Sequence, residues 1–257
     1  MITLIGHGYI GKHIHNELFE QKMEHNWISH KDPMPMNTDY IINCAGYTGV
    51  PNVDACEYNK QETIEGNVLF PLSLERITSV PIMHISSGCV YTGYKDGGWL
   101  ETDTPNFNFD NASFYSASKT LAQELLMPYM NKSYLMRVRM PFCNENNPKS
   151  LLTKLRKYDK LIDKENSVSC VFDIAKVAVH FYKTRPVYGI YNLCNKGSTT
   201  TKKISDKMGL NKDWFTDEEF KNSVIAPRSN CVLNTDKLEF VYKIRSTDEA
   251  LDSCIGI

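Results

Sequence analysis

The sequence lacks an excess of charge of either sign. Its 29 Lys and Arg residues nearly balance its 30 Asp and Glu residues, which leaves a formal net charge of -1. A protein with this balance has no basic field to attract nucleic acid or an anionic membrane surface. The composition therefore argues against both of these partners.

Paired cysteines and metal-ligand spacings are also absent. The 8 cysteines are scattered with no C-x-x-C pair, and the 7 histidines have no spacing typical of a metal site. Scattered cysteines indicate reduced thiols in a cytosol-like compartment rather than a disulfide framework or a zinc site. No stretch resembles a signal peptide or a transmembrane span, because MITLIGHG leads directly into a strand and a turn. We therefore expect a cytoplasmic protein with no metal centre and no membrane partner.

What the sequence does contain is an alternation of short apolar runs with longer amphipathic segments. We expect strands at 2–5, 26–29, 39–45, 80–87, 133–139 and 189–194, and helices from about residue 9 and near 54–78, 113–130, 171–184 and 200–208. This order predicts βαβ units and an α/β fold with a Rossmann-type parallel sheet flanked by helices. Residues 1–139 and 168–194 are assigned to this Rossmann domain, and residues 140–167 and 195–257 to a smaller C-terminal lobe. Residues 92–112, rich in Gly, Pro, Asn and Asp, are expected to form a long loop.

The first predicted strand is followed by a glycine motif, GHGYIG, with Gly6, Gly8 and Gly11 in G-x-G-x-x-G spacing. The first glycine permits a tight turn, the second lets a pyrophosphate approach the backbone, and the third lets helix and strand pack closely. The start of the helix, with Tyr9 and Ile10, would attract the phosphates. Glycines also serve ordinary turns, but the position in the first βα turn favours a dinucleotide site.

The end of the second predicted strand bears on which dinucleotide binds. Its tip, SHKD, presents His30 and Lys31 before the acidic Asp32. An acid at this tip would hold a ribose 2′-hydroxyl, whereas basic groups suit a 2′-phosphate. We therefore predict an NADP-binding domain that uses NADPH, with NADH as the alternative that Asp32 leaves open.

A tyrosine, a lysine and a serine form the first candidate for chemistry. Tyr115 and Lys119 in FYSASK lie four residues apart on one face of a predicted helix, and Ser87 ends a predicted strand. A lysine cation would favour the phenolate and bring the pKa of the tyrosine closer to neutrality. Ser87 could then hold a carbonyl oxygen while Tyr115 delivers a proton. With 14 tyrosines in the chain, Y-x-x-x-K also arises by chance on a surface helix.

The order of these motifs resembles that of the extended short-chain dehydrogenase/reductases. Within them it resembles the reductases of 4-keto-6-deoxy sugar nucleotides, including dTDP-4-dehydrorhamnose reductase. The closer resemblance is to the bifunctional 3,5-epimerase/4-reductases that complete UDP-L-rhamnose synthesis and form the C-terminal module of plant rhamnose synthases. Four stretches carry it: NCAGYTGVPNVDACE, ETDTPNFNFDNASFYSASK, RVRMPFCNENNPKSLLTK and APRSNCVLNTDKL. The glycine turn departs from the family by being one residue shorter.

The resemblance implies two reactions at one site. UDP-4-keto-6-deoxy-glucose would be inverted at C3 and C5 and then reduced at C4 with NADPH to UDP-L-rhamnose. It implies Cys89, in SSGCVY, and Lys154 as the acid and base of inversion, without assigning which is which. A cysteine at a strand end is otherwise a small buried hydrophobe, and Lys154 in SLLTKLRKYDK would otherwise be a solvated surface lysine.

The remaining candidates are contacts. The cofactor would contact residues at the end of the third predicted strand and after the fifth, and Lys119 would bind the nicotinamide ribose. The substrate would contact residues in loops, and the guanidinium of Arg228 suits its diphosphate. The cofactor set adds Asn43, Ala45, Gly46, Asn67 and Met140, and the substrate set is Thr48, Ser87, Cys89, Asn144, Lys154 and Arg228. Asn67 could equally be a helix cap, Arg228 a structural arginine, and Asn144 part of an Asn-Asn-Pro turn.

Two other functions remain open from the sequence. The chain could be a reductase alone, acting on an already epimerised UDP or dTDP sugar, or a catalytically silent NADP-binding regulatory subunit. The complete set of Ser87, Tyr115 and Lys119 argues against the silent subunit. The chain is too short to include a 4,6-dehydratase, so we expect a separate enzyme to supply the substrate. The resemblance also implies a homodimer.

Overall fold

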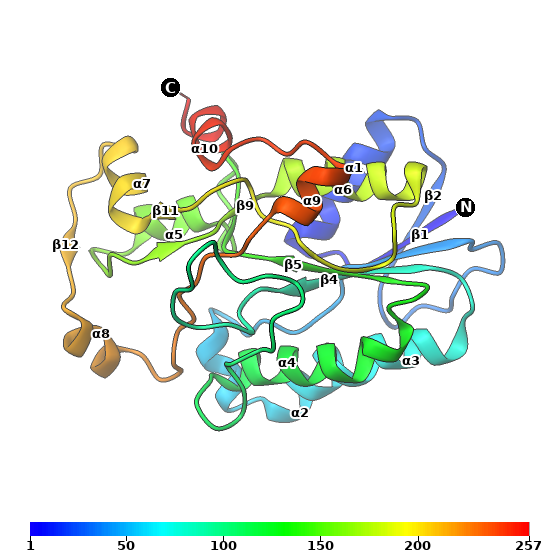
Figure 1. The fold of residues 1–257 in the computed structure, drawn as a ribbon, viewed down its shortest axis with the longest axis horizontal. Coiled ribbons are helices and arrows are strands. Elements are labelled where there is room, and N and C mark those ends of the chain that lie inside the picture. The colour runs from blue at the N-terminus through cyan, green and yellow to red at the C-terminus, as the bar shows by residue number, and fades with distance from the viewer. Residues whose placement is uncertain (257) are drawn as a thin grey trace.

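The computed structural model describes residues 1–256, which are built around a parallel sheet (Figure 1). The sheet has six strands in the order β10-β5-β4-β3-β1-β2, and every neighbouring pair is parallel. The strands are β1 (Ile2–Ile5), β2 (His25–Ile28), β3 (Tyr40–Asn43), β4 (Ile82–Ser87), β5 (Tyr134–Val138) and β10 (Gly189–Asn192). The predicted α/β fold is confirmed.

Helices cover both faces of the sheet. In Figure 1, α1 (Tyr9–Glu20) and α6 (Val171–Thr184) lie above the sheet, and α2 (Lys60–Ile64), α3 (Phe70–Ile77) and α4 (Phe114–Leu126) lie below it. A 3-10 turn, η3 (Met127–Tyr129), extends α4. In α6 the buried positions Ile174, Val177, Ala178 and Phe181 follow helical spacing, which gives the helix one apolar face for the sheet.

The helix expected near 54–78 is divided into pieces. A 3-10 turn, η1 (Val53–Glu57), precedes α2, and a π-helical turn, η2 (Glu65–Leu69), joins α2 to α3. A Cβ on Gly66 in η2 would lie 3.2 Å from the amide nitrogen of Tyr47, so this turn is pressed against the loop that follows β3. Single π-helical turns inside helices are frequent near functional sites.

Beyond β5 the chain forms a second set of short elements with its own apolar cluster. Phe142, Leu152, Leu155, Ile204 and Leu251 are buried together there. Three small sheets pair β6 with β9, β7 with β12 and β8 with β11. The elements are β6 (Pro141–Phe142), α5 (Leu151–Lys157), β7 (Lys160–Leu161), β8 (Glu165–Asn166), β9 (Ser169–Cys170), β11 (Thr199–Thr200), α7 (Thr201–Lys207), β12 (Asp213–Trp214), α8 (Asp217–Ser223) and α10 (Thr247–Ile255).

One helix in the range assigned to the smaller lobe packs on the sheet instead. This is α9 (Asp236–Val241), whose Leu238 is buried in the main core together with Ile244. Figure 1 shows α9 on the same side of the sheet as α6. Amphipathic pattern alone does not reveal which core a six-residue helix joins. The exact lobe boundaries stay a prediction.

The segment 92–112 contains no helix or strand among the described residues, as expected for a long loop. It is nevertheless held by hydrogen bonds to neighbouring segments. The Tyr91 hydroxyl donates to the Asp103 carbonyl at 2.6 Å, and the backbone N–H of Asn192 donates to the Glu101 carboxylate at 2.9 Å. These bonds tie the loop to the segment after β4 and to β10.

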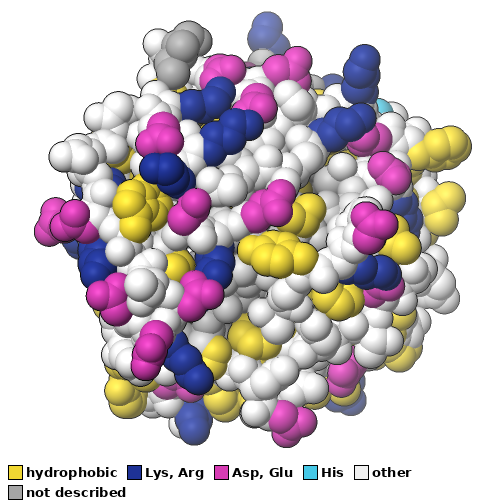
Figure 2. Space-filling model, turned by 60° about the vertical axis from the view of Figure 1, so that its left-hand side comes forward, with side chains coloured by type: hydrophobic (Ala, Val, Ile, Leu, Met, Phe, Trp, Pro, Cys, Tyr) yellow, Lys and Arg dark blue, Asp and Glu magenta, His cyan; other side chains and the backbone are white. Residues whose placement is uncertain are grey.

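The surface agrees with the balanced composition. On the face drawn in Figure 2, Lys and Arg side chains are interspersed with Asp and Glu. Over residues 1–256, no helix has both the length and the hydropathy that crossing a membrane requires.

A buried charge network links β4, α3 and the turn before β5. The Glu75 side chain is 0% exposed and pairs with His84 at 3.1 Å and Lys132 at 3.2 Å. Burial acts to raise the pKa of Glu75, but hydrogen bonds from His84, Ser133 and Lys132 outweigh it and hold the pKa below its ordinary value. The folded state therefore gains stability from Glu75 above the ordinary carboxyl value of about 4.3 and loses it as the pH falls.

We predict that Glu75→Ala lowers the free energy of unfolding by about 3 kcal/mol at neutral pH, because it leaves His84 and Lys132 without their carboxylate. Denaturant unfolding measures this. Glu62→Ala, at an exposed position of α2, is the matched control and should change stability by less than about 0.5 kcal/mol. Equal effects of the two substitutions would contradict the network.

Candidate active site

The turn between β1 and α1 depends on two glycines. Gly6 has a φ of 105°, which residues with a side chain rarely adopt, and a Cβ there would lie 2.9 Å from the amide nitrogen of Ala45. A Cβ on Gly11 would lie 2.2 Å from the Gly6 carbonyl oxygen. Only glycine at both positions lets α1 start this close to the end of β1.

Helix α1 presents an uncapped N-terminus at this turn. Gly8 is the N-cap residue, no side chain caps the helix, and a Cβ on Gly8 would meet no heavy atom within 4 Å. Free N–H groups at the start of a 12-residue helix attract phosphate. The turn thus fits a dinucleotide, whose pyrophosphate the backbone of Gly8, Tyr9 and Ile10 would hold.

The loop after β3 lies beside this turn. Strand order reverses here, because β2 lies on one side of β1 and β3 on the other, and nucleotides bind outside the strand ends at such a point. Asn43 ends β3 and accepts a hydrogen bond from the Ala45 amide at 3.0 Å, and Gly46 is exposed. These three predicted cofactor residues therefore lie next to the glycine turn.

Asn67 holds that loop in place. Its Oδ1 accepts from the Tyr47 amide at 2.9 Å, and its Nδ2 donates to the Tyr47 carbonyl at 2.9 Å and to Ser118 Oγ at 3.1 Å. The side chain is 1% exposed. We assign Asn67 to positioning the loop against α4 rather than to direct contact with a cofactor.

The residues after β2 bear on which dinucleotide the site would take. His30 and Lys31 are both exposed. The Asp32 carboxylate turns back and accepts a hydrogen bond from the Ser29 amide at 2.7 Å. The acid is thereby engaged by its own turn, while two basic side chains remain free for a ribose 2′-phosphate.

Ser87, Tyr115 and Lys119 come together at the end of β4 and the start of α4. Ser87 lies near enough to the Tyr115 phenol to lower its pKa through hydrogen bonding, and Lys119 Nζ lies 5.9 Å from the centre of the Tyr115 ring. Lys119 is 7% exposed, and a Cβ on Gly46 would lie 3.4 Å from its Nζ. The structure therefore places the three side chains beside the loop that follows β3.

We expected Lys119 to lower the pKa of Tyr115, but this pKa is raised. Burial and the neighbouring Cys89 raise this pKa, and the hydrogen bond with Ser87 only partly offsets them. Burial also lowers the pKa of Lys119 to about 8. Sequence spacing places the lysine near the tyrosine but does not reveal that both groups are desolvated. Tyr115 is consequently protonated at neutral pH, as a proton donor to a ketone oxygen must be.

Cys89 and Lys154 lie in the same region. The Cys89 amide donates to Ser87 Oγ at 3.1 Å, and the cysteine is half-buried. Lys154, on α5, interacts electrostatically with Cys89, and its pKa is lowered by burial and by the cations of Lys149 and Arg228. Lys154 is therefore not the freely solvated lysine that its amphipathic segment suggests.

Arg139 also belongs to this site, and our reading of the sequence missed it. It directly follows β5, is 1% exposed, and donates from Nη1 to Cys89 Sγ at 2.9 Å. A signal was present, because an arginine after an apolar strand, in RVRMPF, is costly to bury without a partner. Knowing that β4 and β5 are neighbours would have directed Arg139 toward Cys89.

Three further residues were predicted to contact the substrate, and they differ in how free their side chains are. Thr48 and Asn144 are exposed, and Thr48 Oγ1 accepts a hydrogen bond from Lys149 Nζ at 2.9 Å. Arg228 forms a two-pronged pair with Asp54, at 2.7 Å and 2.8 Å. Asp54 thus already engages the guanidinium that we predicted for the diphosphate, and Lys149 is a further cation on this side of the site.

Met140 has a strained backbone at the edge of the site. Its φ is 39°, one of three positive values among the described residues other than glycine. Such conformations cost free energy and cluster at ligand sites. This fits the predicted contact of a nicotinamide with the Met140 backbone.

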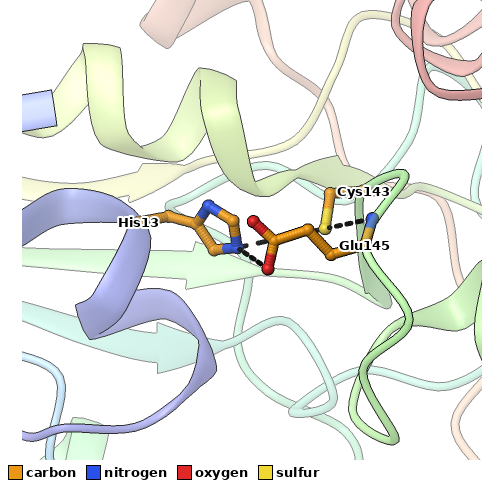
Figure 3. Close-up of side chains that lie close together, drawn as sticks. All are labelled: His13, Cys143 and Glu145. Atoms are coloured by element: carbon orange, nitrogen blue, oxygen red, sulfur yellow. Dashed lines mark hydrogen bonds and ion pairs between the residues drawn. The ribbon is translucent and has the colours of Figure 1, made fainter. Parts of the chain in front are cut away.

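Three potential metal ligands meet where α1 faces the segment after β6. Figure 3 shows His13, Cys143 and Glu145, whose ligand atoms all lie within 4.8 Å of one another. The Tyr9 hydroxyl donates to Cys143 Sγ at 3.0 Å, and Lys12 pairs with Glu145 at 3.2 Å. Burial raises the pKa of the Cys143 thiol, and a metal would need the thiolate. We therefore interpret the cluster as a link between α1 and the segment after β6.

We predict opposite outcomes for two glycine substitutions in the β1–α1 turn. Gly11→Ala should lower the free energy of unfolding by about 2 kcal/mol, because its Cβ would overlap the Gly6 carbonyl. Gly8→Ala is the matched control and should cost less than about 1 kcal/mol, because its Cβ meets open space. Thermal and denaturant unfolding measure both, and equal costs would contradict the described turn.

Comparison with known sequences agrees with this geometry. A family model described as RmlD substrate binding domain matches residues 28–255. A bifunctional dTDP-4-dehydrorhamnose 3,5-epimerase/dTDP-4-dehydrorhamnose reductase of Arabidopsis thaliana is 36% identical over 229 residues, 82% of this chain and 74% of that protein. A trifunctional UDP-glucose 4,6-dehydratase/UDP-4-keto-6-deoxy-D-glucose 3,5-epimerase/UDP-4-keto-L-rhamnose-reductase of the same plant is 34% identical over 226 residues. That match covers 81% of this chain but 33% of that protein, so the chain spans about a third of its length.

Solved structures share the fold. A UDP-rhamnose synthase from Acanthamoeba polyphaga mimivirus superposes with a TM-score of 0.91 at 23% identity, over 99% of this chain and 98% of that one. A dTDP-4-dehydrorhamnose reductase from Bacillus anthracis, in complex with NADP, superposes with a TM-score of 0.82 at 19% identity, over 98% of this chain and 97% of that one. The predicted family is confirmed: the chain belongs to the RmlD substrate binding domain family of extended short-chain dehydrogenase/reductases, among the epimerases and reductases of 4-keto-6-deoxy sugar nucleotides.

Proposed function

We propose that the protein inverts C3 and C5 of UDP-4-keto-6-deoxy-D-glucose and then reduces C4 with NADPH to give UDP-L-rhamnose. The observation that carries this proposal is the meeting of two sets of groups at one site. A ketone-binding serine and tyrosine, Ser87 and Tyr115, lie beside a second acid–base pair, Cys89 and Lys154. A reductase alone has no use for the second pair.

Inversion follows from the acidity of hydrogens next to a ketone. C3 and C5 both neighbour the C4 carbonyl, so removing either hydrogen gives an enolate that Ser87 and Tyr115 stabilise by hydrogen bonds to its oxygen. In a D-gluco ring both hydrogens are axial on the same face. One base on that face and one acid on the other can therefore serve both carbons.

Reduction uses the same hydrogen bonds from Ser87 and Tyr115 to the ketone oxygen. Bound NADPH would supply the hydride. Ser87 Oγ orients the C4 oxygen, and Tyr115, protonated at neutral pH, gives its proton to that oxygen as it gains charge. Lys119, beside Gly46 and Tyr115, would hold the nicotinamide ribose and neutralise the phenolate that remains.

NADPH is the proposed cofactor because the exposed His30 and Lys31 suit a 2′-phosphate while Asp32 is engaged by its own turn. The NADP complex of the Bacillus anthracis protein supports this choice. The uridine nucleotide is supported by the names of the trifunctional plant protein and the viral synthase.

The surroundings of the reaction are part of the proposal. The trifunctional relative has a dehydratase activity, which supports a 4,6-dehydratase as the source of the ketone. The free thiols of all eight cysteines support a reducing, cytoplasmic location. We also propose a homodimer.

The proposal is tested with purified protein, UDP-4-keto-6-deoxy-glucose and NADPH in deuterated water, followed by cofactor oxidation and product NMR. Deuterium at both C3 and C5 of a reduced rhamnosyl product is the expected result. Reduction without deuterium would leave a reductase only. Binding of NADPH with neither signal would indicate a regulatory subunit.

The two reactions should separate by substitution. Cys89→Ser and Lys154→Met should each lower deuterium incorporation at C3 and C5 by at least about 100-fold, because one member of the acid–base pair is lost. Reduction of an already epimerised ketone should fall less than about tenfold. Tyr115→Phe should instead lower reduction by at least about 100-fold. Equal losses of both reactions in the Cys89 and Lys154 variants would contradict separate roles.

Cofactor choice should depend on Lys31. Lys31→Glu should weaken NADPH binding by about tenfold or more, because a charge-assisted contact to the 2′-phosphate becomes a repulsion, while NADH binding stays within about threefold. Fluorescence titration of the reduced cofactors measures both. Parallel losses of the two affinities would place Lys31 outside the 2′-phosphate site.

A further inference from the structure

The first glycine of the β1–α1 turn is hydrogen-bonded by a side chain of the neighbouring strand. Trp27 on β2 pairs with Leu4 in the strand register, and its indole Nε1 donates to the Gly6 carbonyl at 3.1 Å. The Gly6 amide donates to the Ile28 carbonyl at 2.9 Å, so β2 binds both polar groups of this glycine. Gly6 is buried, and a buried backbone carbonyl needs a donor. Among the side-chain hydrogen bonds of residues 1–256, Trp27 supplies the one that this carbonyl accepts.

Trp27 is itself held by three histidines. The His15 ring, on α1, stacks on the indole with centroids 4.0 Å apart, and the His7 ring, in the turn, makes a T-shaped contact with it at 4.8 Å. His15 Nδ1 lies 2.8 Å from His25 Nε2, and His25 Nδ1 lies 2.8 Å from the Met23 carbonyl. Because a carbonyl only accepts, a neutral His25 donates from Nδ1 and accepts from His15 at Nε2. The stacked ring is thereby fixed, and the indole N–H is directed at the turn.

This contact joins the two halves of the proposed cofactor site. The turn leads to the uncapped start of α1, whose N–H groups would hold the pyrophosphate, and β2 leads to His30 and Lys31, which would hold the 2′-phosphate. Because α1 begins at Tyr9, three residues after Gly6, a movement of Gly6 would displace these N–H groups. The bond from Trp27 therefore bears directly on where the pyrophosphate can bind.

We propose that Trp27 is a positioning residue for the dinucleotide. Its indole N–H fixes the Gly6 carbonyl and so keeps the first N–H groups of α1 in place for the pyrophosphate. Trp27 acts through the turn and does not itself touch the cofactor. The identity of the cofactor rests on the proposed function, whereas the hold of Trp27 on the turn does not.

The test is the affinity of Trp27→Phe for NADPH and for NADH, measured by isothermal titration calorimetry. Phenylalanine keeps an aromatic ring for His15 but removes the N–H, which leaves the Gly6 carbonyl without its donor. Both affinities should fall by a similar factor, at least about fivefold, because the two cofactors carry the same pyrophosphate. This parallel loss differs from the effect of Lys31→Glu, which should weaken NADPH alone.

Trp99→Phe is the matched control. Trp99 is also half-buried, stacks on Tyr91 with centroids 4.7 Å apart, and donates from Nε1 to the Gly93 carbonyl at 2.9 Å. It thus loses the same kind of hydrogen bond, but in the loop 92–112 and away from the β1–α1 turn. Denaturant unfolding should show comparable losses of stability in the two variants, whereas Trp99→Phe should leave both cofactor affinities within about twofold.

A second readout needs no cofactor. Amide hydrogen exchange of a peptide covering residues 6–12 should be at least about threefold faster in Trp27→Phe, because the turn has lost its tie to β2, and unchanged in Trp99→Phe. Should Trp27→Phe fail to fold, His15→Leu removes the ring stacked on the indole while keeping the N–H. It should weaken both cofactors in parallel by a smaller factor.

Unchanged affinity for both cofactors in the folded Trp27→Phe would overturn the proposal. Equal losses in Trp99→Phe would also overturn it, because the effect would then follow from stability. A loss confined to NADPH would place Trp27 at the 2′-phosphate and not at the turn. Failure of the unmodified protein to bind either cofactor would contradict the proposed function instead, and unchanged exchange of residues 6–12 in Trp27→Phe would still refute the hold on the turn.

Discussion

Parallel pairing of the strands is the constraint on which the rest of the site depends. Because β1, β3, β4 and β5 run in the same direction, their carboxyl ends share one edge of the sheet. That edge receives Gly6, Asn43, Ser87 and Arg139 from four separate parts of the sequence. The glycine turn, the serine that we propose binds the ketone, and the arginine that donates to Cys89 are thereby brought together without any sequence motif that spans them.

Burial then sets the chemistry of the groups at this edge. It raises the pKa of Tyr115 and lowers the pKa of Lys119 to about 8, which suits the proposed role of the tyrosine as a proton donor. It also makes a lone guanidinium costly, which is why the contact between Arg139 and Cys89 is informative. In the proposed mechanism, the hydrogen bonds from Ser87 and Tyr115 to the C4 oxygen serve both inversion and reduction. An enolate and a developing alkoxide both carry negative charge on that oxygen.

Much of the fold could be predicted from the sequence, since apolar runs of four to six residues alternate with amphipathic helices. The candidate catalytic residues could also be indicated, because Ser87 ends a strand and Tyr115 and Lys119 lie four residues apart in the first half of a helix. Arg139 was missed since its role depends on the neighbouring strand. The predicted lowering of the Tyr115 pKa was wrong because burial and the neighbouring Cys89 raise this pKa. The pair of Arg228 with Asp54 joins residues far apart in sequence, and no local pattern reveals it.

The measurement that tests the central claim most directly compares two rates in Ser87→Ala. One is deuterium exchange at C3 and C5 in the absence of NADPH, and the other is reduction of an already epimerised ketone with NADPH. A shared grip on the C4 oxygen predicts that both rates fall by a similar factor, on the order of 100-fold. A loss confined to reduction, with exchange unchanged, would contradict a single ketone site for both reactions.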